Sequence, residues 1–188
     1  METSKPLRAD ARRNYERLLD EAKRAFGQHG VDASLEEIAR RAGVGIGTLY
    51  RHFPTRNALL EVLLRNRFDT QAKVARELLW HPSPSAALQE WLAELARTST
   101  TYRGLVASVA TALSDESSEL YASCHAMQDA AARLLARAQE AGEIRAEVAS
   151  LDLMLLANGV AWAVEHAPDG QGSIGRLSAL VFSGLRTS

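Results

Sequence analysis

Apolar residues recur at intervals of three and four positions along nearly the whole chain, and the alternation expected of β-strands is almost absent. In the first such segment the apolar positions are Tyr15, Leu18, Leu19, Ala22, Ala25 and Phe26. This spacing places the side chains on one face of an α-helix. Because the pattern resumes after each break, the sequence predicts an all-α protein of about nine helices.

Glycines, prolines and hydroxyl side chains mark where these helices begin and end. The first helix ends at Gly30, and the next three cover residues 35–42, 45–52 and 55–79. The fifth starts at Pro84, the sixth covers about 102–113, and the seventh is opened by residues 114–119 and ended by Gly142. The last two cover residues 151–166 and about 174–185. Ser34 and Glu37 form the sequence signature of a capping box, and Ser150 is the predicted N-cap of the eighth helix.

The charge of the chain is unevenly distributed. Residues 1–60 hold eleven Lys and Arg against eight Asp and Glu, whereas the remainder holds eleven against fifteen. A basic N-terminal third indicates either a polyanionic partner or a chance variation of surface charge along the chain. The single cysteine, Cys124, and the lack of an apolar segment after the N-terminal charges lead us to expect a cytoplasmic protein without a membrane partner.

Two short helices joined at a glycine, residues 35–42 and 45–52, form the sequence outline of a helix-turn-helix. Ala39 is small where the helices would cross, and Gly43 lies in the turn, where a positive φ suits glycine. Leu49 would face the small core. The second helix would then project from the surface as a recognition helix.

The composition of that second helix suits close contact with DNA. Gly45 and Gly47 carry no side chain that would hold a sugar-phosphate strand away. Ile46 and Thr48 can reach base edges, because an apolar group suits the thymine methyl and a hydroxyl bonds to donors or acceptors. Phosphate contacts are expected from Tyr50, His52 and Arg56.

The segment "SLEEIARRAGVGIGTLYRHFPTRNALL" resembles the DNA-binding signature of TetR-type transcriptional regulators, over roughly residues 11 to 65. The resemblance implies a three-helix DNA-binding domain, residues 8–54 with its motif at about 33–52, and a six-helix effector-binding and dimerisation domain, residues 55–188. It also implies that Ser34, Thr48, Tyr50, His52 and Arg56 grip DNA.

Two positions depart from the family pattern. Gly45 stands where a serine or threonine is frequent, which removes one capping hydroxyl and one phosphate contact. Arg56 stands where lysine is more common, which keeps the charge. At the N-terminus, the basic residues Lys5, Arg8, Arg12 and Arg13 form either an arm that follows the DNA backbone or simply a solvated chain end.

The last two predicted helices have the composition of a dimer interface. The eighth is apolar on more than one face, more than a monomer of this size easily buries. We expect a homodimer whose interface includes Leu151, Leu155, Gly159, Val160, Ala163, Leu177, Leu180, Val181 and Gly184. A two-fold dimer reads a palindromic operator.

By the same resemblance, the body holds a small, mostly apolar effector that releases the protein, as a repressor, from its operator. The candidate ligand-binding residues are Trp91, Tyr102, His125, Asn158 and Trp162. The alternative is a DNA-binding regulator whose body binds a protein partner or only dimerises. A third hypothesis, an all-helical enzyme or module without DNA binding, has little support.

Catalytic and cofactor motifs are not found in the sequence. The five histidines are scattered, and Cys124 and His125 would point about 100° apart on a helix, so no metal site is predicted. No phosphate-binding glycine loop and no nucleophile motif occur. We therefore expect no cofactor and no enzymatic activity.

Overall fold

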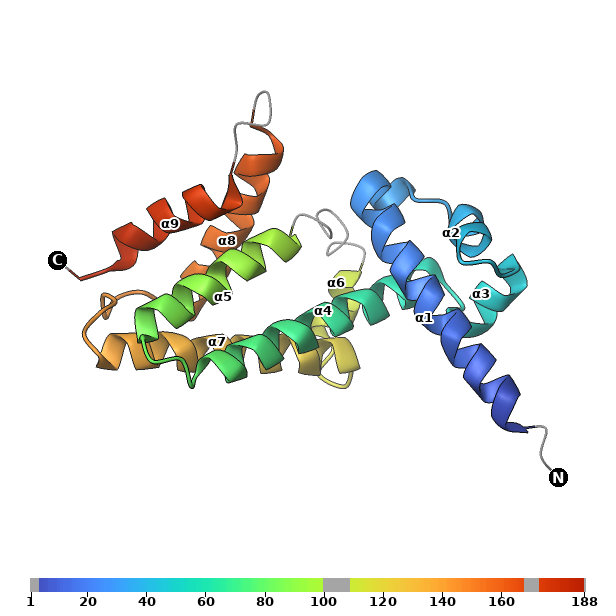
Figure 1. The fold of residues 1–188 in the computed structure, drawn as a ribbon, viewed down its shortest axis with the longest axis horizontal. Coiled ribbons are helices and arrows are strands. Elements are labelled where there is room, and N and C mark those ends of the chain that lie inside the picture. Colours follow the sequence, from blue (N-terminus) through green and yellow to red (C-terminus); the bar gives the residue numbers. More distant parts are fainter. Residues whose placement is uncertain (1–3, 100–108, 168–172, 188) are drawn as a thin grey trace. The chain divides into compact units, whose positions relative to one another are not determined.

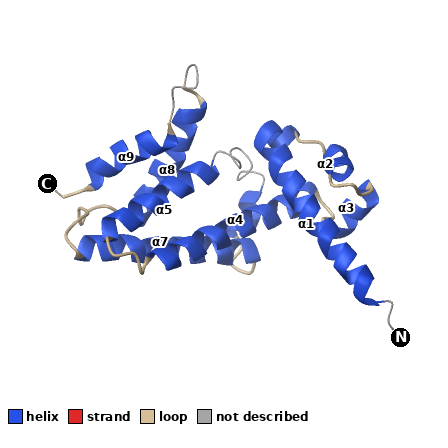
Figure 2. Cartoon of the chain, viewed as in Figure 1, coloured by secondary structure: helices blue, strands red, loops and turns tan. Residues whose placement is uncertain are grey.

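Helices make up most of the backbone that the computed structural model describes, which comprises residues 4–99, 109–167 and 173–187 (Figures 1 and 2). In chain order the elements are α1 Ser4–His29, the short 3-10 helix η1 Gly30–Asp32, α2 Leu35–Arg41, α3 Ile46–His52, α4 Arg56–Leu78, α5 Pro84–Ser99, α6 Ala110–Ser114, α7 Glu119–Glu140, α8 Ser150–Glu165 and α9 Ile174–Leu185. The all-α prediction is confirmed. The helix predicted at 102–113 lies largely outside the described residues, and its described end is α6.

The chain folds into two compact units. The first contains residues 1–64 and 101–111, and the second contains residues 65–100 and 112–188. Helix α4 contributes its first turns to one unit and its remainder to the other. The domain boundary predicted between residues 54 and 55 stays a prediction.

The first unit is a small three-helix core (Figure 1). Helix α1 packs against α2, and α2 packs against α3. Apolar side chains from all three helices are buried there, and each of the following is at most 1% exposed: Leu18, Phe26, Ile38, Ala39, Leu49 and Phe53. Because α2 and α3 have only seven residues each, their stability depends on this packing rather than on helix propensity.

Helix α5 lies at the centre of the second unit. It packs against α7, α8 and α9, and its buried side chains include Leu88, Trp91, Leu92 and Leu95. Helix α7 turns an apolar face toward the core, where Leu120, Met127, Ala131, Leu134 and Ala138 are buried. An antiparallel bridge between Ile144 and Arg186 joins the loop after α7 to the end of α9.

Most predicted helix ends agree with the structure to within about two residues, but α7 begins only at Glu119, with Ser118 as its N-cap, and the cap of α8 differs. Gly30, Gly43 and Gly142 have φ of 55°, 71° and 71°, and each follows the end of an α-helix. At α8 the predicted cap is wrong: Ala149, not Ser150, is the N-cap residue. The Asp152 carboxylate accepts a hydrogen bond of 2.8 Å from the Ala149 N–H, so the helix start is set by an acidic residue in its first turn.

Within the described residues, no helix combines the length and the apolar content that crossing a bilayer requires.

Candidate nucleic-acid interface

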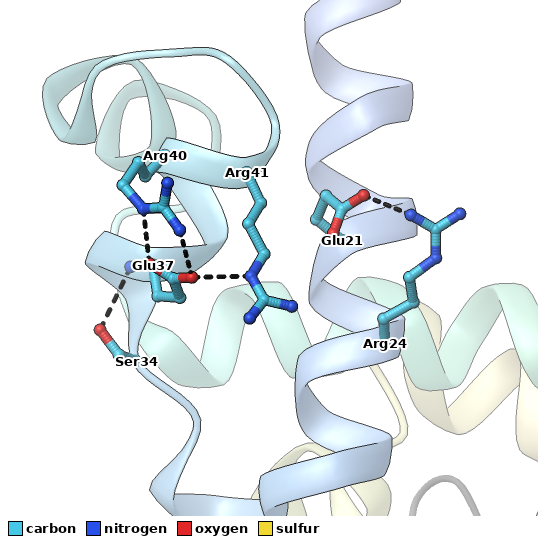
Figure 3. Close-up of polar contacts among 6 residues, drawn as sticks. All are labelled: Glu21, Arg24, Ser34, Glu37, Arg40 and Arg41. Carbon is cyan, nitrogen blue, oxygen red and sulfur yellow. Dashed lines mark hydrogen bonds and ion pairs between the residues drawn. The ribbon is translucent and has the colours of Figure 1, made fainter.

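Helix α2 begins at a hydroxyl cap and carries a cluster of charged side chains (Figure 3). The Ser34 Oγ accepts from the Glu37 N–H at 3.2 Å, which is one half of the predicted capping box. The other half does not form, because the Glu37 carboxylate accepts from Arg40 at 2.6 and 2.7 Å and from Arg41 at 2.7 Å. These hydrogen bonds, first from Arg40 and then from Arg41, lower the pKa of Glu37 to about 2.

The turn between α2 and α3 depends on one glycine. Gly43 has φ of 71°, and its N–H donates to the Arg40 carbonyl at 3.1 Å. The next N–H, of Val44, donates to the Ala39 carbonyl at 3.0 Å. A non-glycine residue in this left-handed conformation is strained. The predicted role of Gly43 is therefore confirmed.

The glycines of the recognition helix have no such conformational role. Gly45 is the N-cap of α3 with φ of −73°, and it provides no side-chain cap. Gly45 and Gly47 are both exposed, and a Cβ atom at either position would meet nothing within 4 Å. Since the fold leaves room for a side chain at both positions, it does not explain these glycines.

Thr48 is held by a residue that the sequence analysis missed. Arg51, one turn further along α3, donates to the Thr48 hydroxyl at 3.0 Å and to the Gly47 carbonyl at 3.3 Å. The signal in the sequence is a basic residue one turn after Thr48 on the same helix, and the Arg51 side chain is exposed. The recognition helix therefore presents a guanidinium beside the hydroxyl that we expect to reach base edges.

The aromatic side chains at the end of α3 divide between surface and core. Tyr50 is 44% exposed, whereas Phe53 is 1% exposed and stacks on Tyr15 of α1 with ring centroids 5.3 Å apart. His52 is half-buried and meets Tyr15 edge-on at 5.6 Å. Tyr15 thus orients the histidine, a supporting role that the sequence analysis did not assign.

The start of α4 lies near the start of α2. Thr55 caps α4, accepting from the Ala58 N–H at 3.0 Å, and the Arg56 guanidinium lies 5.7 Å from the Phe26 ring. Hydrogen bonds from the Glu36 N–H and from Ser34 lower the pKa of Glu36, and the positive charge of Arg56 acts in the same direction to a smaller extent. Two of the predicted DNA contacts, Ser34 and Arg56, therefore both act on the Glu36 carboxylate, Ser34 through a hydrogen bond of 3.0 Å and Arg56 through its charge.

The basic N-terminal run is part of a helix rather than an extended arm. Helix α1 begins at Ser4, so all four residues of the run belong to its first turns. Arg12 pairs with Glu16 at 2.8 Å and Arg13 pairs with Asp10, and both guanidinium groups are largely exposed. The side chains of Lys5 and Arg8 lie outside the described residues.

The candidate ligand-binding residues are not brought together in the described structure. Trp91 is fully buried, and its Nε1 donates to the Gln71 carbonyl at 3.1 Å. Asn158 is exposed and bonds to the Met154 carbonyl, and Trp162 is 56% exposed. His125 is exposed, and Tyr102 lies outside the described residues. No group of three or more His, Cys, Asp or Glu side chains suited to a metal ion occurs within the described parts of the chain.

The predicted dimer residues form an exposed apolar surface on α8 and α9. Leu151, Leu155 and Leu180 are 63%, 62% and 57% exposed, which is unusual for leucine in a folded protein. The glycines of the set, Gly159 and Gly184, are exposed, and Ala163, Leu177 and Val181 are half-buried. Val160, in contrast, is 6% exposed and belongs to the core of its own protomer.

Comparisons with known proteins cover nearly the whole chain. Residues 18–63 match the model for bacterial regulatory proteins of the tetR family, and residues 83–187 match the model for the C-terminal domain of SbtR-like transcriptional regulators. Among curated proteins, an HTH-type transcriptional regulator of Staphylococcus aureus (strain USA300) is 36% identical over 64 residues, which are 34% of this chain and 35% of that protein. The match therefore spans about a third of the length of the curated relatives.

Solved structures extend the similarity to more than nine-tenths of the chain. A TetR transcriptional regulator from Streptomyces coelicolor is 35% identical, with a TM-score of 0.70 over 92% of this chain and 98% of that one. A TetR regulatory protein from Mycobacterium vanbaalenii is 33% identical, with a TM-score of 0.66 over 97% and 100%. LfrR from Mycobacterium smegmatis, solved with proflavine, is 24% identical with a TM-score of 0.67 over 94% and 98%, and so shares the fold.

Proposed function

Because the chain belongs to the TetR family of bacterial regulatory proteins, we propose that it is a dimeric repressor that binds a palindromic operator and is released by a small, mostly apolar ligand. The family assignment makes it a helix-turn-helix transcriptional regulator. Members of this family bind DNA, typically dimerise and are generally not enzymes. The repressor role, the operator symmetry and the effector are the proposed part.

The observation that carries the proposal is the pair of glycines on the recognition helix. Gly45 and Gly47 face open space, so a side chain there would cost the fold nothing. Inside a helix glycine is destabilising by about 0.5–1 kcal/mol relative to alanine, a cost that applies to Gly47 but not to Gly45, which is the N-cap. Close approach of a second molecule explains the glycines, because it is the one condition under which a Cβ would be harmful.

The other proposed DNA contacts come from residues of α2, α3 and α4. Ile46 and Thr48 would meet base edges, with Arg51 beside Thr48. Tyr50 and His52 on α3, Ser34 at the start of α2 and Arg56 at the start of α4 would bind phosphates. Phosphate contacts fix the position of the recognition helix, and the base contacts determine the preferred sequence.

Selection of bound duplexes from a random pool tests the proposal. A two-fold symmetric consensus is expected, with affinity that falls as salt rises, because phosphate contacts release counterions. Tyr50→Phe combined with His52→Ala should abolish tight binding while helical content and dimer remain. Unfolding of this variant, or binding to no duplex at low salt by the wild type, contradicts the proposal.

A regulator without a small-molecule effector is the second candidate. It is favoured by the placement of the predicted ligand-binding residues, since Trp91 already has its hydrogen bond and His125, Asn158 and Trp162 are exposed. Thermal unfolding with candidate ligands separates the two, because a ligand that binds only the folded state raises its stability. A body that no small molecule stabilises, together with intact operator binding, would favour this second candidate.

A further inference from the structure

The recognition helix α3 carries two polar side chains that hydrogen-bond to each other. Arg51 donates from Nη2 to the Thr48 Oγ1 at 3.0 Å and from Nε to the Gly47 carbonyl at 3.3 Å. Arg51 and Gly47 are both exposed, and a Cβ atom at Gly47 would meet nothing within 4 Å. Nothing on Gly47 therefore keeps a base pair away from the two polar groups.

The contact between these side chains determines how the Thr48 hydroxyl is used. A guanidinium only donates, so the Thr48 oxygen is the acceptor in this pair and its own hydrogen points to another atom. Helical threonines often direct that hydrogen to the carbonyl one turn earlier, as Thr70 and Thr98 do at 2.7 and 3.1 Å. Thr48 makes no such bond within the described residues, so its hydroxyl is left to donate to a partner from outside the chain.

The Arg51 guanidinium also retains donors. Its contacts use the Nε hydrogen and one Nη2 hydrogen. Within the described residues, neither the Nη1 hydrogens nor the second Nη2 hydrogen has an acceptor. Thr48 and Arg51 therefore present hydrogen-bond donors side by side, an O–H and the N–H groups of a guanidinium.

Adjacent donors match one base better than the others. In the major groove guanine presents two acceptors, N7 and O6, and no donor. Adenine presents an acceptor beside a donor, thymine an acceptor beside a methyl group, and cytosine a donor. A phosphate could also accept from Arg51, but Thr48 lies in the first turn of α3, the part of a recognition helix that contacts base edges.

We propose that Thr48 and Arg51 together recognise one guanine in the major groove of each operator half-site. The Thr48 hydroxyl donates to one of the two guanine acceptors, and the Arg51 guanidinium donates to the other. This inference rests on the proposed binding to an operator, and it specifies a base that the operator contains.

Selection of duplexes from a random pool, in parallel with full-length wild type and variants, tests the inference. The wild type should select a guanine at one position of each half-site, and Arg51→Met should lose that preference while it keeps the rest of the consensus. Arg51→Lys retains the charge without the planar fork, so it should keep the salt dependence of affinity but only part of the guanine preference. Arg76→Met, at an exposed position of α4 in the second unit, should select the wild-type consensus.

A modified base tests the contact at a single atom. In the selected duplex, 7-deazaguanine at this position removes the N7 acceptor and keeps the Watson–Crick pairing. Wild-type affinity should fall by about tenfold at constant ionic strength, whereas the double variant Thr48→Val with Arg51→Met should bind both duplexes equally. Thr48→Ser retains a hydroxyl and should still distinguish them. Circular dichroism checks that the helical content of each variant is unchanged.

The outcomes separate this inference from the proposed function. If Arg51→Met weakens binding to all sequences equally and makes the salt dependence shallower, Arg51 contacts a phosphate and the inference is overturned. An unchanged consensus for Arg51→Met, or equal wild-type affinity for the guanine and 7-deazaguanine duplexes, also overturns the inference while operator binding stands. Failure of the wild type to bind any duplex overturns the proposed function instead.

Discussion

At the scale of single residues, three glycines in one short segment have different physical roles. Gly43 is required by the backbone, because its φ of 71° is unfavourable for any residue with a Cβ. Gly45 and Gly47 have open space around them, so the folded chain tolerates a side chain there. A side chain added at Gly45 or Gly47 should therefore be tolerated by the fold but should weaken DNA binding.

Gly47→Ala tests this separation directly. The variant should be more stable than the wild type by about 0.5–1 kcal/mol, because alanine favours the helix, yet it should bind operator DNA more weakly. Urea unfolding and a duplex-binding titration measure the two effects. Gly43→Ala is the matched control, and it should lose stability by about 1 kcal/mol. Unchanged DNA affinity in Gly47→Ala would show that this glycine does not serve close approach.

Glu37 provides a pH-dependent prediction at the same scale. Its pKa of about 2 lies below the ordinary value of 4.5, chiefly because Arg40 and then Arg41 donate to the carboxylate. A lowered pKa in the folded state contributes stability that is present above the ordinary pKa. That contribution is lost as the pH falls from about 4.5 to about 2.

Glu37→Gln should therefore have a lower urea midpoint than the wild type at neutral pH, and the difference should shrink as the pH falls through that window. Unfolding followed by circular dichroism at both ends of the window measures it. Glu90→Gln, at an exposed position of α5, changes the net charge equally and should show no such dependence. A difference that stays constant with pH would mean that the ion pairs add nothing to stability.

At the scale of secondary-structure elements, α8 combines two apolar faces with different partners. Leu153 and Ala157 are at most 1% exposed and pack within the protomer, whereas Leu151 and Leu155, on the same helix, are more than 60% exposed. The exposed apolar face of α8 is accounted for if a second molecule covers it. The second copy of the chain is the expected partner.

Leu155→Glu should convert the dimer to a folded monomer, because a charge would be buried at the interface while the core of the protomer is untouched. Sedimentation velocity reports the mass, and circular dichroism reports the helical content. Leu153→Glu should instead unfold the second unit, since that side chain is fully buried. A Leu155→Glu protein that remains dimeric would place the interface elsewhere.

At the scale of the whole molecule, tight binding should require both recognition helices at once. In a two-fold dimer the half-sites lie about one helical turn, roughly 34 Å, apart. An operator lengthened by about half a turn, roughly 5 base pairs, between its half-sites turns one half-site to the opposite face of the duplex. Its affinity in a gel-shift titration should fall to that of a single half-site. Retained affinity would mean that one subunit is sufficient.

The sequence alone determined the helical architecture and most of the recognition helix. Apolar spacing places Leu18, Ile38 and Leu49 in the core, and the turn at Gly43 needs a positive φ, so both are local properties of the chain. Periodicity and capping depend on neighbours within a few residues, which is why they can be read without a structure. For the same reason the recognition helix could be predicted as a DNA-binding element.

The three-dimensional structure decided which of several possible partners each side chain takes, both within a helix and between helices. It showed that Glu37 binds Arg40 and Arg41 rather than completing a capping box, and that Arg51 holds Thr48. It also showed that Ala149 is the N-cap of α8, that Val160 is buried in its own protomer, and that the buried Gln71 Oε1 has no hydrogen-bond partner within the described residues. These contacts depend on competition among alternative partners and on the distance between helices, and neither is encoded in the local pattern of apolar residues.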